Sequence, residues 1–271
     1  MFTPVAGVPA APPASGLVAS AVRPNLDRWE TGLAWIPERC GTEYRLVPVC
    51  DEPEVGYSGP RPGAAYYQPV GAQFADECST LNGPVDLDRV RRVAEAQTPY
   101  VIARELWDGE LTQTDQYTPP GGTPQSNAYL ASPDAEVVDT GAAAALVALG
   151  QLEQAALEAS HGQPVMLHVP VAVSWQLAPS LFRVGQQLLT AAGNVVVADA
   201  GYPGSGPAGQ PAGATVWAYA TAPVAVLTSP LTFIDGAAAV DHATNTRTVW
   251  ASRLFAATFD PCVHLATEIT L

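Results

Sequence analysis

Lysine is missing from this chain of 271 residues, so the twelve positions that hold lysine or arginine are all arginine. Aspartate and glutamate number 26, which gives a formal net charge of −14 at pH 7. A surface this acidic repels phosphate, so we expect no basic patch for nucleic acid. Without lysine, the chain also cannot contain the phosphate-binding motif G-x-x-x-x-G-K-[ST].

Long apolar runs are also absent, which argues against a membrane partner. No run approaches the roughly 18 residues that a membrane-spanning helix needs. The first residues, MFTPVAGVPAAPPASG, have neither a basic start nor a continuous apolar stretch, so we expect no secretory signal. Apolar residues still make up 48% of the chain, which is ample for a buried core.

Cysteine is scarce, and its spacing does not suggest a metal site. Cys40, Cys50, Cys78 and Cys262 form no C-x-x-C pair, so we expect no zinc. Reduced, partly buried thiols are the ordinary state in a protein that folds in the cytosol. The alternative is a disulfide formed late, after cell lysis, for which Cys40 and Cys50 are close enough in sequence.

Sequence motifs for catalysis are either absent or lack the neighbouring secondary structure that they need. Residues 204–209 fit G-x-G-x-x-G, but Pro207 and Pro211 prevent the helix whose N-terminus would bind a pyrophosphate. We therefore interpret 201–213 as a surface loop. No G-x-S-x-G nucleophile motif occurs.

The histidines and carboxylates favour structural roles. His168 lies in an apolar strand and is predicted to be a hydrogen-bonded core residue. In the last strand, Cys262, His264 and Glu268 share one face, yet a reactive thiol needs an exposed, electropositive pocket. The carboxylates of Glu105, Asp108 and Glu110 gather at a helix end, where solvation or an inter-subunit contact with arginine is expected. We predict no catalytic residue, cofactor or metal ion.

The first 65 residues are rich in proline, which excludes long helices and central strands there. This stretch nevertheless holds Trp29 and Trp35, which a free disordered tail would not be expected to carry. We interpret it as an arm that gains order by lying on a neighbouring subunit. The alternative is an ordinary N-terminal segment packed on its own domain.

Hydrophobic spacing predicts a mixture of helices and strands, and hence an α+β fold. Pro99 is expected to bend or divide the first helix, and the stripe Leu177, Leu181, Val184 and Leu188 predicts the third. The predicted helices cover 86–107, 140–160 and 178–192. The predicted strands are several short ones within 64–84, a buried one starting at 164, and others at 194–198, 215–227, 246–259 and 263–270.

Three stretches carry a resemblance to a known family. They are VRRVAEAQTPYVIARELWDG, AALVALGQLEQAALEASHGQPVMLHVPVAVSWQL and RTVWASRLFAATFDPCVHLATEI. In this order, behind a long arm, they resemble the spine helix, the start of the axial domain and the last strands of the Hong Kong 97-type capsid fold. Tailed-phage major capsid proteins share this fold with encapsulin shells. The resemblance covers roughly 65–271.

The resemblance implies a division of the chain into the parts of that fold. The expected parts are the N-terminal arm at 1–62, the extended β loop at 63–84, the spine helix with the first part of the peripheral domain at 85–139, the axial domain at 140–230, and the closing strands of the peripheral domain at 231–271. Some members of the fold crosslink neighbours through a Lys–Asn bond, which a chain without lysine cannot form.

The implied function is that of a structural subunit of an icosahedral phage head. Such subunits assemble with copies of themselves into pentamers and hexamers in the host cytoplasm, enclose the genome, and reside in the virion. Portal, scaffold or decoration proteins are further expected partners. Candidate anchors between subunits are Trp29, Trp35, Tyr66 and Tyr67, and deletion of 1–40 is expected to leave a soluble subunit that forms no shell. The alternatives are a tail or decoration protein, an encapsulin-type shell, or a secreted binding or hydrolytic protein.

Overall fold

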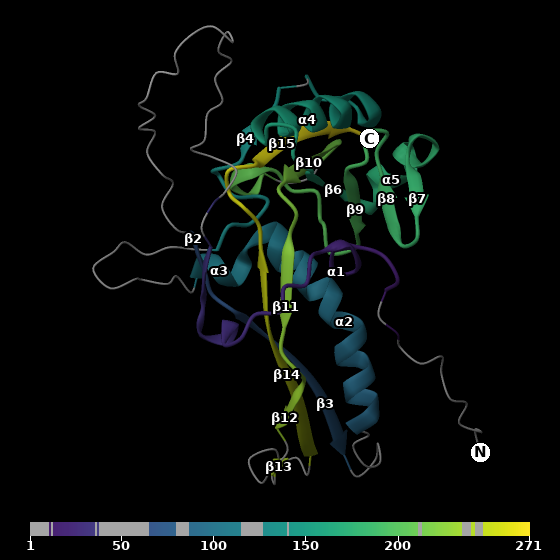
Figure 1. The fold of residues 1–271 in the computed structure, drawn as a ribbon. Helices are drawn as coiled ribbons and strands as arrows, with labels where there is room; N and C mark the ends of the chain where they lie inside the picture. The colour runs from purple at the N-terminus through teal and green to yellow at the C-terminus, as the bar shows by residue number, and fades with distance from the viewer. Residues whose placement is uncertain are drawn as a thin grey trace, which may run out of the picture.

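The computed structural model describes residues 11, 13–35, 37, 65–79, 87–114, 127–139, 141–210, 213–234, 240–241 and 246–271. Within them, helices and strands form two parts, which Figure 1 shows one above the other. The upper part is a mixed sheet covered by helices, and the lower part is an elongated antiparallel sheet with one long helix along it. The predicted α+β class is confirmed.

The upper sheet has eight strands in the order β4-β15-β10-β6-β9-β8-β7, with β5 also pairing with β15. Its strands are β4 (Glu136–Val137), β5 (Ala143–Ala144), β6 (Met166–Pro170), β7 (Phe182–Val184), β8 (Gln187–Leu189), β9 (Val195–Asp199), β10 (Thr215–Thr221) and β15 (His264–Thr270). The central strands β6, β9, β10 and β15 are mostly buried, as their runs of valine, alanine and leucine predict.

Helix α4 (Ala145–Ala159) packs against β15 and β10. Its alanines and leucines favour a helix, and its buried face places Ala148, Leu149 and Leu152 in a core with β6 and β10. The helix ends at Ala159, and beyond it the N–H of Gly162 donates to the carbonyl oxygen of Leu157 at 2.7 Å. This element was correctly predicted.

The lower sheet is built around one long strand. Strand β14 pairs antiparallel with β3 over ten residues, and with three shorter strands. The strands are β3 (Val70–Ser79), β11 (Ala225–Thr228), β12 (Thr232–Ile234), β13 (Val240–Asp241) and β14 (Thr246–Thr258). The prediction of several short strands within 64–84 is therefore wrong for 70–79, where β14 supplies a continuous partner.

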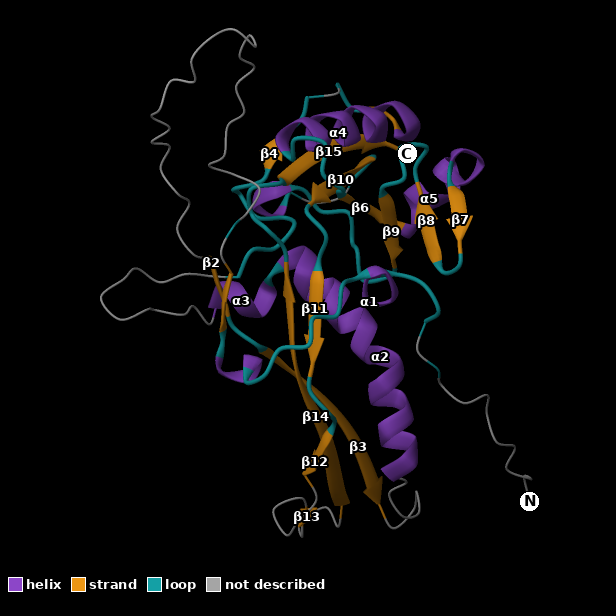
Figure 2. Cartoon of the chain, in the orientation of Figure 1, coloured by secondary structure: helices purple, strands orange, loops and turns teal. Residues whose placement is uncertain are grey.

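The long helix is α2 (Leu87–Asp108), and the short α3 (Glu110–Thr114) follows it. Helix α2 contacts both β3 and β14, and Figure 2 shows it running beside that sheet. It continues through Pro99 as one helix, so the predicted division does not occur. Its last turn buries Leu106 and Trp107 in the main core.

The described N-terminal residues pack on their own chain. They form α1 (Leu17–Ser20), the 3₁₀ helix η1 (Trp29–Thr31) and β1 (Leu33–Trp35), which pairs with β2 (Ala65–Tyr67). The N–H of Val22 donates to the carbonyl oxygen of Val224 at 2.9 Å, and the N–H of Val226 donates back to Val22. For residues 13–35 the interpretation as an arm on a neighbour is therefore wrong, and the alternative, packing on its own domain, holds.

Two further predicted elements are wrong. The expected third helix at 178–192 is instead the end of α5 (Val171–Leu177), a 3₁₀ turn η2 (Ala178–Ser180) and the hairpin β7–β8. The expected strand at 215–227 is divided between β10 and β11, which belong to different sheets. A bend at Ala222 and Pro223 separates them, because proline cannot donate to a strand ladder.

The expected unit at 231–271 does not coincide with the sheets. Strand β14 lies at the centre of the lower sheet, whereas β15 lies inside the upper sheet between β4 and β10. The expected axial unit at 140–230 likewise contains β11, which pairs with β14. The range 231–271 thus includes one strand of the upper sheet, β15, and the range 140–230 includes one strand of the lower sheet, β11.

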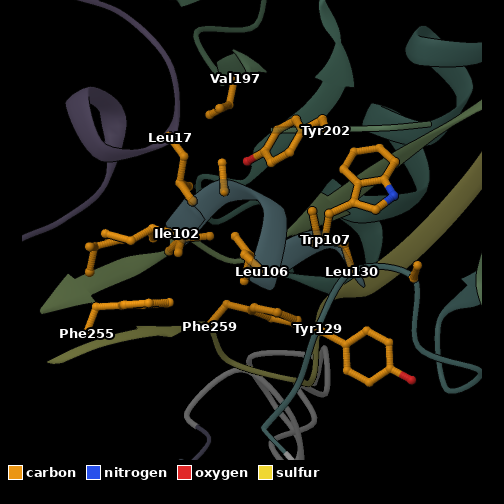
Figure 3. Close-up of a cluster of buried hydrophobic side chains, with 14 of the residues drawn as sticks. Leu17, Ile102, Leu106, Trp107, Tyr129, Leu130, Val197, Tyr202, Phe255 and Phe259 are labelled. Carbon is orange, nitrogen blue, oxygen red and sulfur yellow. The ribbon is translucent and has the colours of Figure 1, made fainter. Parts of the chain in front are cut away.

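The main core lies where the two parts meet. Figure 3 shows Trp107, Leu106 and Ile102 of α2 beside Leu17, Tyr202 and Phe259, which come from segments far apart in sequence. A second core lies between α4 and the upper sheet. Contacts among distant segments therefore hold the N-terminal residues, α2 and both sheets together.

Candidate functional site

The carboxylate of Asp199 attaches the N-terminal segment to the body. Its Oδ2 accepts the N–H of Leu17 at 2.8 Å, and its Oδ1 accepts the N–H of Gly201 at 2.9 Å. Gly16, with φ of 108°, lies so close that a Cβ there would be 2.3 Å from Oδ2. Only glycine fits this approach. Burial raises the pKa of Asp199, while these two N–H groups act to lower it.

Replacement of Asp199 by Ala is expected to loosen this attachment. It leaves the buried N–H groups of Leu17 and Gly201 without their acceptor, which should cost about 1–3 kcal/mol of unfolding free energy. Hydrogen exchange should become faster at 17–22 while β14 stays protected. Unchanged exchange at 17–22 would show that Asp199 does not hold the segment.

The carboxylates of Glu105 and Asp108, at the end of α2, contact groups of their own chain, whereas solvation or a contact with another subunit was predicted. Glu105 accepts the N–H groups of Leu111 and Thr112 at 3.2 and 3.0 Å, and so caps α3. Asp108 forms an ion pair with Arg104 at 2.5 Å and accepts the hydroxyl of Ser205 at 3.1 Å. These oxygens bind groups of their own chain.

The imidazole of His168 is buried, and both of its nitrogens are occupied, which confirms the predicted core role. Nε2 lies 2.9 Å from the hydroxyl of Thr221, and Nδ1 lies 2.9 Å from that of Tyr202. Thr221 donates its proton to the carbonyl oxygen of Ala222 at 2.7 Å. Nε2 must therefore donate to Thr221, and Nδ1 accepts from Tyr202.

Cys262 lies in the turn before β15, so the prediction that it shares a strand face with His264 and Glu268 is wrong. His264 is buried, and its Nε2 lies 2.9 Å from the carbonyl oxygen of Leu130. Glu268 accepts the hydroxyl of Thr215. Cys262 is disulfide-bonded, so the expectation of reduced thiols is wrong for this residue. Cys40 and Cys50, the predicted pair, lie outside the described residues.

The predicted anchors are spread between the core and the surface. Trp29 is buried against Leu227 and Ala256 of its own chain. Tyr67 is buried too, and its hydroxyl donates to the carbonyl oxygen of Phe259 at 2.5 Å. Tyr66 is half-buried, and the side chain of Trp35 lies outside the described residues. Trp29 and Tyr67 thus stabilise their own subunit.

The strands that carry these residues also shape a hollow. A cavity of about 200 Å³ is lined by residues 31–34 of the N-terminal segment and 66–68 of β2 and the turn after it. Tyr66 and Tyr67 are among the lining residues, so the structure brings these two together with the N-terminal segment.

The segment interpreted as a surface loop, 201–213, is largely built into the body. Residues 201, 202, 204, 206 and 207 are buried. The carbonyl oxygen of Ser205 accepts the indole N–H of Trp107 at 3.2 Å and the hydroxyl of Tyr219 at 2.9 Å. The surface-loop interpretation is therefore wrong for residues 201–207, because two buried aromatic donors need its carbonyl oxygen.

Gly201 is required where this segment crosses α2. A Cβ at this position would lie 2.7 Å from the carbonyl oxygen of Tyr100 and 2.8 Å from the Cβ of Ala103. Gly201→Ala is expected to destabilise the fold by about 1–3 kcal/mol through overpacking. Gly150→Ala, in open space within α4, should stabilise by about 0.5–1 kcal/mol. Thermal unfolding of both variants measures these opposite changes in stability. Equal melting temperatures for the two variants would contradict the predicted crowding at Gly201.

Sequence reasoning missed an exposed apolar surface on the upper sheet. Trp175 of α5 is 78% exposed, and Phe182 and Val184 of β7 are each 60% exposed. A patch of this kind commonly marks a contact with another protein. A signal was present, because residues 171–198 contain one charged residue, Arg183.

The described residues show no other site that calls for a ligand. None of the described helices is long and apolar enough to cross a membrane. Among the same residues, no group of three or more His, Cys, Asp or Glu side chains could hold a metal ion.

No protein-family model matches the sequence, and neither does any curated protein. Solved structures do match the fold. The capsid of an empty GTA particle has a TM-score of 0.58 at 12% identity, with 100% of this chain and 94% of that chain covered. Subunits of Mycobacterium phage Adephagia and Mycobacterium phage Ogopogo have TM-scores of 0.52 and 0.51, both at 14% identity. The matches cover 98% and 99% of this chain, and 91% and 96% of those chains.

These matches identify the fold. They extend over nearly the whole of both chains, so the likeness includes the N-terminal segment, the long helix and both sheets. The chain has the Hong Kong 97-type capsid fold that the three sequence stretches predicted.

Proposed function

We propose that this chain is the shell-forming subunit of an icosahedral phage head. One observation carries the proposal: the capsid of the GTA particle and this chain share their fold over 94% and 100% of their lengths. A binding module or an enzyme that shared only one of the two sheets would match the capsid subunit over part of the chain. The proposed partner is the chain itself, in pentamers and hexamers that enclose the genome.

The two sheets support a division of the subunit into two domains. We assign the upper sheet with α4 and α5 to the axial domain, and the lower sheet with α2 to the peripheral domain. Glu105, His168 and His264 bind groups of their own chain, which supports a structural role for these residues. Assembly in the host cytoplasm and residence in the virion belong to this proposal.

The net charge of −14 supports the same role. A shell lining that faces packaged nucleic acid gains nothing from adhesion, and an acidic surface repels the phosphates. Portal, scaffold and decoration proteins are further proposed partners. A tail or decoration protein and an encapsulin-type shell remain the alternatives.

Negative-stain microscopy of the purified full-length chain tests the proposal. Closed shells tens of nanometres across are the expected result. Rings or tubes would favour a tail protein, and particles that persist as monomers at high concentration would contradict a shell subunit. Nucleic acid inside shells isolated from infected cells would separate a phage head from a cargo-carrying encapsulin shell.

A further inference from the structure

One edge of the upper sheet is apolar and carries a single positive charge. The edge strand β7 is exposed at all three of its residues, Phe182, Arg183 and Val184. Trp175 adds the most exposed large apolar side chain among the described residues, on the helix that precedes β7. Exposed apolar side chains on a helix and on an unpaired strand edge are costly in water unless another protein covers them.

Arg183 is without an ion-pair partner among the described residues, although the chain has 26 acidic side chains. No acidic residue occurs between 171 and 198. Arg183 is exposed on the edge strand, so its guanidinium is in a position to bind a carboxylate supplied from outside the subunit.

The opposite edge of the same sheet has the complementary character. Strand β4 is exposed at both residues, Glu136 and Val137, and Val137 is 53% exposed. Exposed Asp134 and Asp139 flank the strand, so 134–139 hold three carboxylates and no basic residue. This edge presents an apolar side chain among negative charges.

The two edges lie at the two ends of the strand order, and Figure 1 shows β4 and β7 on opposite sides of the upper part. A contact between different surfaces on opposite sides of identical subunits is head-to-tail. Such a contact closes into a ring when the rotation between neighbours divides the full circle. A partner with a single matching surface would leave one of the two edges uncovered.

We propose that the β7 edge of each subunit docks on the β4 edge of a second copy, with Arg183 paired to Glu136 and with Trp175, Phe182 and Val184 buried beside Val137. The inference rests on the proposed function and names the contact that joins subunits within a ring. The apolar side chains supply most of the buried area, and the charges fix which edge meets which.

A charge exchange in the full-length chain tests the contact. Arg183→Glu and Glu136→Arg each place like charges in the contact and should lower the assembled fraction, measured by sedimentation velocity, about tenfold or more. The double variant restores opposite charges and should recover assembly to within about threefold of the parent chain. Matched controls are Arg28→Glu and Glu30→Arg, which make the same charge changes at exposed positions of the N-terminal segment and should assemble normally.

The outcomes separate this contact from the proposed function. If the parent chain forms shells and both single variants do so equally well, the edge contact is overturned and the shell function stands. If neither the singles nor the double variant assembles, the pairing of Arg183 with Glu136 is overturned. A parent chain that stays monomeric overturns both proposals.

A second measurement needs no variant. Hydrogen exchange of parent shells is compared with that of subunits dissociated from them. Amides at 134–139 and 182–184 should both be slower in the shell, because each edge is covered by the other. Exchange that is unchanged at either edge would overturn the proposal.

Discussion

Replacement of Trp107 by Ala is expected to lower the free energy of unfolding by about 3–5 kcal/mol, which is the usual cost of deleting a large buried aromatic side chain. The indole is fully buried at the end of α2. It lies 4.8 Å from the ring of Tyr202 and 4.9 Å from that of Tyr219, measured between centroids. Its N–H also donates to the hydroxyl of Ser205 at 2.9 Å. Truncation leaves a cavity where the two parts of the subunit meet.

The matched control is Trp175→Ala, the same change at a side chain that is 78% exposed. Urea unfolding of the two variants gives the comparison, and the control should stay within about 0.5 kcal/mol of the parent chain. Similar losses in both variants would contradict the placement of Trp107 in the main core. Trp175→Ala should instead weaken assembly, because the residue belongs to the proposed contact.

Acid is expected to destabilise the subunit through its buried histidines. Burial lowers the pKa of His168 to about 3, from the usual value of 6.5, and burial also lowers that of His264. Between pH 6.5 and 3 the unfolded chain binds a proton at position 168 that the folded chain does not bind. Stability therefore falls as the pH drops below about 6.5, by roughly 1 kcal/mol per pH unit for this histidine.

Urea unfolding between pH 7.5 and 4.5 measures this dependence. His168→Gln removes the titrating group, so its stability should fall less steeply with acid than that of the parent chain. His161→Gln, the same change at an exposed histidine, is the matched control. A parent chain and a His168→Gln variant with the same slope would show that His168 is protonated alike in both states.

The elements that could be predicted from the sequence are those whose signal is local. Helix α4 has a helix-favouring pattern of alanine and leucine, and β14 and β15 lie within about one residue of the strands predicted at 246–259 and 263–270. The resemblance carried by the three stretches identified the fold, because it used the order of the elements as well as their composition.

The expected helix at 178–192 failed because its apolar spacing had another cause. Val184 lies on an exposed edge strand, and Gly185, with φ of 59°, begins the turn of the β7–β8 hairpin. A glycine in the left-handed region favours a tight turn over a helix. Periodicity alone does not distinguish a helical stripe from a hairpin whose apolar residues face a partner.

Contacts between distant segments were beyond sequence reasoning. The attachment of Leu17 by Asp199 joins residues 182 positions apart, and the buried roles of Trp29 and Tyr67 depend on strands near the C-terminus. Aromatic side chains in a proline-rich segment indicated that something covers them. They did not indicate whether these side chains are buried against a neighbouring subunit or against their own chain.

Deletion of 1–40 now has a different expected result. Because Leu17 and Trp29 fill the core of their own subunit, the deletion exposes apolar surface on the body as well as removing the segment. Loss of shells in that variant would not separate assembly from folding. The charge-exchange variants avoid this problem, since Arg183 and Glu136 are exposed.

A cryo-electron microscopy reconstruction of particles formed by the full-length chain alone tests self-assembly most directly. The expected result is a closed icosahedral shell, with subunits arranged around five-fold axes through the part that holds the upper sheet. Open, irregular aggregates, or a sample that stays monomeric at the highest attainable concentration, would contradict it.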